Sequence, residues 1–179
     1  FEIETLKHNL LFPSYPASRG ICAMGGILNN NSGGEKSLQY GKTEKYVKRV
    51  KSVLSDGKTY EFRKINEQEL NAKMAQKDFE GEIYGKIFKL INDNYDEIMK
   101  AKPDVSKNSA GYSLWNVYDR ENKTFDLTQL WVGSQGTLGL LLEGDLDLVT
   151  IHEHRGMLII YLHDLSHLGQ IINAVLELN

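Results

Sequence analysis

Residues 46–62 read YVKRVKSVLSDGKTYEF, and this stretch decides the fold class. Residues 46–54 are rich in valine, Asp56-Gly57 follows directly, and apolar and polar residues alternate again over residues 59–62. An Asp-Gly pair between two such runs is typical of the tight turn of a β-hairpin. The stretch therefore predicts two antiparallel strands joined by a short turn.

The residues after this hairpin predict helix. Between Asn66 and Met99, apolar residues recur at the three- or four-residue spacing of one helix face, namely Ile83, Ile87, Leu90, Ile91 and Ile98. Pro103 marks the far limit of the pattern. We therefore expect a helical insert over about residues 66–102, and an α+β fold in which a mainly antiparallel sheet is flanked by helices.

The remaining segments are shorter. Two prolines favour an extended loop over residues 12–16, and paired glycines predict one brief helix within residues 20–34. A strand is expected from the end of the 133–139 glycine turn to about Val149, and another from His152 to Leu162. A final amphipathic helix from about Leu168 is expected, capped by Asp164 or Ser166.

Composition limits the class of protein. A chain of 179 residues with 41% hydrophobic residues is long enough for one ordinary domain, and its net charge of −3 favours neither nucleic acid nor an acidic membrane as partner. The single cysteine, Cys22, excludes an internal disulfide and a CxxC zinc site, and it favours a reducing, cytoplasmic setting. The apolar runs are far shorter than the roughly 20 residues of a membrane-spanning helix. Because the chain begins at Phe1 without an initiator methionine, we expect either a preceding segment or a removed tag.

Two glycine-rich segments could hold an anion. Residues 20–34 read GICAMGGILNNNSGG and residues 133–139 read GSQGTLG. Successive backbone N–H groups in glycine turns bind phosphate well, because no side chain blocks the approach of the anion. Neither segment is a GxGxxG or GxxxxGK[ST] motif, so spacing alone leaves open both an anion site and two ordinary turns.

Six separated segments carry a resemblance to known proteins, namely Phe12 to Ser18, Gly25 to Gly34, Tyr40 to Thr43, Val53 to Gly57, Ser109 to Tyr112, and Gly133 to Gly139. They occur in the order found in the FAD-binding domain of the vanillyl-alcohol oxidase, D-lactate dehydrogenase and glycolate oxidase subunit family. The chain resembles this family of FAD-linked oxidases, with their PCMH-type FAD-binding domain, over most of its length. The helical insert is similar to that of larger members such as bacterial D-lactate and D-2-hydroxyglutarate dehydrogenases.

The resemblance implies FAD as the cofactor and a place for it. In such proteins the segment matching Pro16 to Gly26 lies along the flavin and its ribityl-pyrophosphate tail, and the segment matching Gly133 to Gly139 closes over the same cofactor. Small residues there let the main chain approach a flat ring. One departure is Gln135, where the family usually has an acidic residue. The implied cofactor-binding residues are Pro16, Ala17, Ser18, Cys22, Ala23, Gly25, Gly26, Asn30, Ser32, Gly33, Gln135, Gly136, Thr137, Leu138 and Gly139.

The resemblance also implies which parts of the family lie elsewhere. The first pyrophosphate loop of the family precedes the segment matching Phe12, and residues 1–11 contain nothing like it. The catalytic and metal-binding residues lie in a cap domain beyond the segment matching Asn179. We therefore expect residues 1–150 to be the second half of the FAD-binding domain and residues 151–179 the start of the cap. No catalytic residue or metal ligand is assigned in this chain, and we expect it to bind FAD weakly by itself.

The function implied is that of an FAD-dependent oxidoreductase. Its substrate would be a D-2-hydroxy acid such as lactate, glycolate or 2-hydroxyglutarate, oxidised by hydride transfer to FAD. Two alternatives stay open: a non-catalytic interaction module of the same fold, and a family member that oxidises another alcohol.

Other conspicuous residues favour plain structural roles. The four histidines at 152, 154, 163 and 167 fall on different elements and do not predict a metal site. Cys22 is interpreted as a small packed side chain. The aromatic residues Trp115, Trp131 and Tyr118 are expected in the core, and only Tyr112 is singled out by its motif. The cluster of Lys42, Lys45, Lys48, Arg49 and Lys51 is expected on the solvated face of a strand.

Overall fold

The computed structural model describes residues 1–105, 107–151 and 156–178. It confirms the predicted hairpin as strands β2 (Val47–Val53) and β3 (Thr59–Asn66), which pair antiparallel with Val50 opposite Phe62. Gly57 takes a positive φ of 76° in the turn, and the Lys58 N–H donates to Asp56 Oδ1 at 3.0 Å. The Asp-Gly pair therefore closes the turn as expected, with glycine in the backbone region that it tolerates best.

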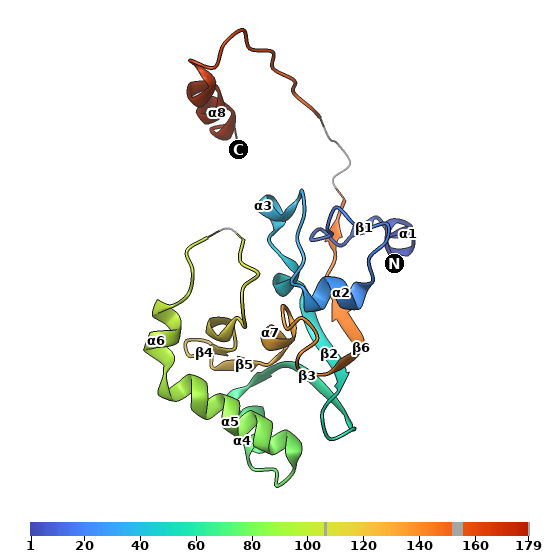
Figure 1. The fold of residues 1–179 in the computed structure, drawn as a ribbon, viewed down its shortest axis with the longest axis vertical. Coiled ribbons are helices and arrows are strands. Elements are labelled where there is room, and N and C mark those ends of the chain that lie inside the picture. Colours follow the sequence, from blue (N-terminus) through green and yellow to red (C-terminus); the bar gives the residue numbers. More distant parts are fainter. Residues whose placement is uncertain (106, 152–155, 179) are drawn as a thin grey trace.

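The hairpin forms the centre of a five-stranded antiparallel sheet (Figure 1). The strand order is β4-β5-β3-β2-β6, where β4 is Tyr118–Asp119, β5 is Thr124–Asp126 and β6 is Leu140–Leu146. The predicted strand to Val149 is divided into two. The pairing of β6 with β2 ends next to Asp147, whose N–H donates to the Tyr46 carbonyl at 2.7 Å. Residues beyond it form β7 (Val149–Thr150), which pairs with β1 (Leu10–Leu11) in a separate small sheet.

The helical insert is confirmed as three helices, α4 (Glu67–Met74), α5 (Phe79–Asp93) and α6 (Tyr95–Lys100). Asn66 and Glu69 form a capping box at the start of α4, and Asp78 caps α5 by accepting from the Gly81 N–H at 2.9 Å. The cap at Asp78 explains why the insert is divided, since each cap residue has extended backbone. In Figure 1, α4 and α5 lie along one side of the sheet.

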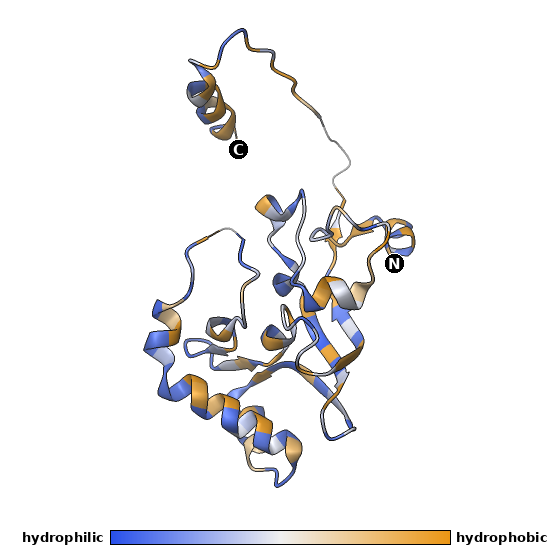
Figure 2. Cartoon of the chain, in the orientation of Figure 1, coloured by the Kyte–Doolittle hydropathy of each residue, from blue (hydrophilic) through white to orange (hydrophobic). Residues whose placement is uncertain are grey.

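The core lies between this insert and the sheet. Val50, Phe62 and Phe125 of the strands pack in one buried cluster with Tyr84 of α5 and Trp131. Ring centroids of Phe62 lie 6.3 Å from Tyr84 and 5.9 Å from Trp131. Full burial of one such side chain contributes roughly 2–3 kcal/mol. Figure 2 shows hydrophobic and hydrophilic residues alternating along α5, as in a helix with one buried face.

Short elements complete the fold. The brief helix predicted within residues 20–34 is confirmed as α2 (Met24–Asn29), whereas α1 (Glu2–Leu6) was not predicted. Residues 12–16 form neither helix nor strand, as expected. The other short elements are α3 (Ser37–Tyr40), η1 (Thr43–Lys45), η2 (Leu114–Asn116) and α7 (Thr128–Trp131).

The C-terminal residues differ from the sequence-based expectation. The predicted strand is wrong for residues 156–162, which have no strand structure and are exposed, while residues 152–155 lie outside the described part. A strand requires a hydrogen-bonded neighbour, and none of the described strands pairs with this apolar run. The last helix is confirmed as α8 (Leu168–Leu176), but its N-cap is His167, whose side chain makes no capping hydrogen bond to the backbone. Asp164 instead accepts from the Ser166 N–H at 2.8 Å in the preceding turn.

The basic cluster at residues 42–51 is also placed differently from expectation. Lys42 and Lys45 precede β2, and Lys42 is buried, with 6% of its surface exposed. Arg49 does lie on the solvated sheet face, where it pairs with Asp145 and Glu61 at 2.7 Å each. Among the helices of the described residues, none has the length and apolar character needed to cross a bilayer.

Candidate cofactor site

The two glycine-rich segments, more than 100 residues apart in sequence, lie side by side. The N–H of Gly133 donates to the Leu28 carbonyl at 3.2 Å, and the N–H of Gln135 donates to the Asn29 carbonyl at 2.9 Å. The side chains join as well, because Gln135 Nε2 lies 3.2 Å from Asn30 Oδ1. The structure therefore brings the C-terminal end of α2 against the 133–139 turn.

The first segment leaves main-chain donors free. Within the described residues, the N–H groups of Met24, Gly25 and Gly26 have no hydrogen-bond partner, as expected for the first turn of a helix. A Cβ added at Gly26 would have no heavy atom within 4 Å, and one at Gly25 would meet only the Leu141 side chain at 3.7 Å. Open space therefore lies over Gly26, where a ligand could approach the backbone.

The second segment shows the same feature in part. The N–H groups of Gly136, Leu138 and Gly139 have no partner in the part of the chain that the structure describes. Gly136 has a φ of 76° and open space where a Cβ would stand. At Gly139 a Cβ would lie 2.4 Å from the Val53 carbonyl oxygen, so this glycine is needed for packing. Of the two glycines, only Gly136 faces open space.

Gln135 has a non-glycine left-handed backbone, with a φ of 54°. Such a conformation costs about 1 kcal/mol, and the two bonds to Asn29 and Asn30 hold it in place. The amide of Gln135 acts as the donor to Asn30 Oδ1, a role that the acidic residue of the resembled family would not fill. The departure at this position therefore serves the contact between the two turns.

A third segment of the resemblance joins the site. The Tyr112 hydroxyl and Thr137 Oγ1 are hydrogen-bonded at 2.6 Å, and Thr137 Oγ1 also lies 2.5 Å from the Ser134 carbonyl. Tyr112, which its motif had singled out, thus connects the 108–113 loop with the second glycine turn. It is partly exposed rather than part of the core.

Two of the sequence-predicted site residues hold the turn from inside. Ser32 is buried, and its carbonyl accepts from the N–H and hydroxyl of Thr43 at 3.2 and 2.8 Å. A Cβ at Gly33 would lie 2.5 Å from Ser37 Oγ. Sequence reasoning missed the buried Asn31, whose Nδ2 donates to Glu44 Oε2 at 2.7 Å and whose Oδ1 accepts from the Glu44 N–H at 3.1 Å. No local pattern pointed to this pair.

The residues before α2 form the approach to the first segment. Ala17, Ser18 and Ala23 are exposed, while Pro16 and Cys22 are half-buried. A cavity of about 230 Å³ lies beside them, with Tyr15, Arg19, Cys22 and Met24 in its wall. The Arg19 guanidinium stacks on the Tyr15 ring at 4.5 Å. Burial and the hydrogen bond to Glu35 raise the pKa of Tyr15.

The arrangement fits a flat, anionic cofactor. Small residues precede α2, free N–H groups occur on both turns, and open space lies over Gly26 and Gly136. Such features let the main chain contact a ring or a phosphate without obstruction. In the described residues no group of histidine, cysteine and acidic side chains is arranged for a metal, and His152 and His154 lie outside those residues. Fold and site together thus define an α+β cofactor-binding domain.

Comparison with known proteins agrees with this class. A family model described as an FAD binding domain matches residues 3–63. The chain is 28% identical over 155 residues to a D-2-hydroxyglutarate dehydrogenase of Haemophilus influenzae, covering 84% of this chain and 15% of the relative. It is 32% identical over 133 residues to the enzyme of the same name from Pantoea ananatis, covering 74% and 13%. It is 26% identical over 167 residues to glycolate oxidase subunit GlcD of Bacillus subtilis, covering 93% and 24%.

Residues 3–63 thus match an FAD binding domain, and the chain is similar over most of its length to D-2-hydroxyglutarate dehydrogenases and a glycolate oxidase subunit. The cofactor of this domain family is FAD. The chain spans between 13% and 24% of the length of the three relatives named above.

Proposed function

We propose that the protein carrying this chain is an FAD-dependent oxidoreductase that oxidises a D-2-hydroxy acid. The names of the relatives support this class, since they include D-2-hydroxyglutarate dehydrogenases, D-lactate dehydrogenases and a glycolate oxidase subunit. When bound, FAD would accept the hydride from the carbon that bears the hydroxyl group. D-lactate, glycolate and D-2-hydroxyglutarate are the substrates to test first.

The role of this chain in that reaction is to hold and orient the cofactor. The observation that carries the proposal is the junction of the two glycine turns through Leu28, Asn29, Gly133 and Gln135. We propose that Gly25 and Gly26 present free N–H groups to the anionic part of FAD. We propose further contacts from the small residues at 16–18, 22 and 23, from Asn30 and from residues 135–138, whereas Ser32, Gly33 and Gly139 support the two turns from inside.

We further propose a domain boundary near residue 150. Residues up to this point form the two sheets, and β7 ends at Thr150 in its pairing with β1. Large apolar side chains are exposed both in the run at residues 157–162 and on the amphipathic helix α8. Such exposure is expected for elements that begin another domain. The substrate-binding and catalytic groups would belong to that second domain.

The cofactor role can be tested with Gly26→Leu in the intact protein that carries this chain. The added side chain enters open space, so the fold should remain while the new group covers the free N–H donors. We expect FAD content, measured by flavin absorbance after purification, to fall at least tenfold. Gly85→Leu is the matched control, because Gly85 is also helical and has no heavy atom within 4 Å of an added Cβ.

Two results would count against the proposal. If Gly26→Leu retains the same FAD content as Gly85→Leu, the turn at α2 is not a cofactor contact. If the intact wild-type protein carries no FAD and binds none on addition, the alternative of a non-catalytic module of the same fold is supported instead. Reduction of the bound flavin by one of the three hydroxy acids, followed at its visible absorbance, tests the substrate class.

A further inference from the structure

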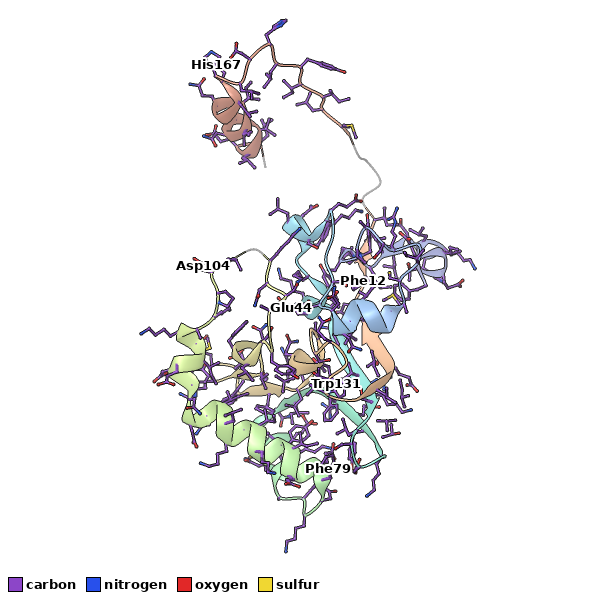
Figure 3. The ribbon with its side chains drawn as sticks, viewed as in Figure 1. Phe12, Glu44, Phe79, Asp104, Trp131 and His167 are labelled. Atoms are coloured by element: carbon purple, nitrogen blue, oxygen red, sulfur yellow. The ribbon has the colours of Figure 1, made fainter. Side chains whose placement is uncertain are left out.

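A second polar pocket, of about 510 Å³, is lined by none of the residues that carry free N–H groups on the two glycine turns. One wall is the segment from Ser37 to Lys45, and the other is formed by residues 102–105, by Asn108 and by residues 113–116. In Figure 3, Glu44 marks the first wall, and Asp104 marks the loop that leads into the second. None of the proposed FAD contacts lines this pocket.

A buried lysine lies in its wall. Lys42 is 6% exposed, and its Nζ donates to the Asn108 carbonyl at 2.7 Å and to Ser109 Oγ. No carboxylate of the described residues lies within ion-pair distance of it. Both of its acceptors are neutral, and burial lowers the pKa of this ammonium. A buried charge normally has a partner of opposite sign, because desolvation is costly without one.

Other side-chain donors around the pocket have neither a hydrogen-bond partner nor an ion-pair partner among the described residues. Ser113 is 7% exposed, and its hydroxyl makes no hydrogen bond within the described residues. The side-chain amide of Asn116 likewise has no partner there. Lys45 and Lys102 are exposed at the rim and form no ion pair with any described residue. The pocket therefore offers charged and neutral donors together.

The charge balance of the lining sets the charge of the ligand. Three lysines and one glutamate line the pocket. The Glu44 carboxylate accepts from Asn31 Nδ2 and forms no ion pair with Lys42, although its charge offsets part of that of the lysine. Lys107 adds to the positive field at Lys42. The lining carries two more positive charges than negative ones, which matches an anion of charge about −2.

We propose that this pocket binds a small oxyanion carrying two negative charges, with Lys42 as its buried anchor and Ser113 as a neutral donor. Lysine binds carboxylate and phosphate oxygens as a point charge, so a dicarboxylate and a phosphate share the chemistry that the site recognises. This pocket is separate from the proposed cofactor contacts, but hydrogen bonds connect the two regions. Lys42 donates to the loop that carries Tyr112, and Glu44 accepts from Asn31. The proposal does not depend on the substrate of the protein.

The test is isothermal titration calorimetry, in which the intact protein is titrated with succinate and with inorganic phosphate at low ionic strength. We expect at least one of the two to bind, and the probe that does so identifies the source of the oxyanion. Lys42→Met should abolish binding. The double variant Lys45→Gln/Lys102→Gln, which changes only exposed side chains, should weaken it about fivefold to tenfold.

The control is Lys86→Gln/Lys89→Gln, which removes the same charge from the exposed face of α5. It should bind the probe as the wild type does. The proposal is overturned if neither probe binds, or if the rim double variant binds as tightly as this control. Flavin absorbance is recorded for every sample, so loss of FAD with intact anion binding would count against the proposed function alone.

Discussion

Two side chains at positive φ hold the candidate site together, and both make their bonds with residues remote in sequence. Asn31, with a φ of 45°, contacts Glu44 twice, and Gln135, with a φ of 54°, contacts Asn29 and Asn30. Non-glycine residues take this conformation at a cost, so they occur where surrounding bonds compensate for it. At the scale of single residues, the site is therefore defined by polar contacts rather than by the glycines alone.

Replacement of Asn31 tests this view. Asn31→Ala removes both bonds to Glu44 and leaves a β-carbon in a left-handed backbone, so we expect the free energy of unfolding to fall by about 2–3 kcal/mol. Urea denaturation followed by circular dichroism measures the change. Asn71→Ala is the control, since Asn71 is exposed on α4 and makes no side-chain hydrogen bond with any described residue, so this change should not lower the free energy of unfolding. Equal effects of the two substitutions would contradict the role of Asn31.

The hairpin turn predicts a dependence on alkaline pH. Tyr60 donates to Asp56 Oδ2 at 2.5 Å, and this bond raises the pKa of Tyr60 to about 12. Because the folded pKa lies above the unfolded value of about 10, the stabilisation is complete below pH 10 and is lost as the pH rises through 12. Tyr60→Phe should therefore be less stable than the wild type at pH 8, and the difference should shrink by pH 11.5.

Denaturation curves at the two pH values measure this difference. Tyr161→Phe, at a side chain that is 90% exposed, serves as the control and should follow the wild type. A difference between Tyr60→Phe and wild type that stays constant from pH 8 to pH 11.5 would show that the hydrogen bond is not the cause.

At the scale of elements, local sequence accounts for most of the secondary structure. The alternation of apolar and polar residues around Asp56-Gly57 corresponds to the hairpin of β2 and β3. The spacing of isoleucines within α5 matches the buried and half-buried positions of that helix. The start of the insert and the break between α4 and α5 also have local causes, because Asn66 and Asp78 each cap a helix start. The run at residues 157–162 shows the limit, since strand propensity without a neighbouring strand gave no strand.

The capping box of α4 gives a prediction for this scale. Asn66→Ala removes the acceptor for the Glu69 N–H and should lower the free energy of unfolding by about 1 kcal/mol. Asn71→Ala makes the same chemical change at an exposed interior position of α4, where alanine is the better helix former. Thermal unfolding should therefore show a lower melting temperature for the first variant and an equal or higher one for the second. The reverse order would rule out a contribution from the cap.

At the scale of the whole molecule, burial divides the chain into two parts. Of the residues that the structure describes, every buried hydrophobic one lies before Thr150, among them Phe62, Phe125 and Trp131. Between residues 156 and 178 every described side chain is exposed except Ile171, which is half-buried. The apolar run and α8 therefore contribute little to the stability of the core formed by the first part.

Limited proteolysis of the 179-residue chain tests this division. Chymotrypsin should cut first after Tyr161, which is 90% exposed in a segment without helix or strand, and should leave the bonds after the buried Phe62 and Phe125 intact. Mass spectrometry of the early fragments identifies the site. In the intact protein the same bond should be protected if residues 151–179 open a further domain. First cleavage within residues 59–66 would disagree with the described core.

The sequence by itself determined the α+β class, the hairpin, the helical insert and the two glycine-rich segments, because each depends on neighbours two to four positions away. Only the tertiary structure decided that the α2 end and the 133–139 turn meet, that β1 pairs with β7, and that Lys42 is buried instead of lying on a solvated strand. These features depend on which distant segments pack together, and neither the burial of a single lysine nor a long-range hydrogen bond leaves a periodic pattern in the sequence.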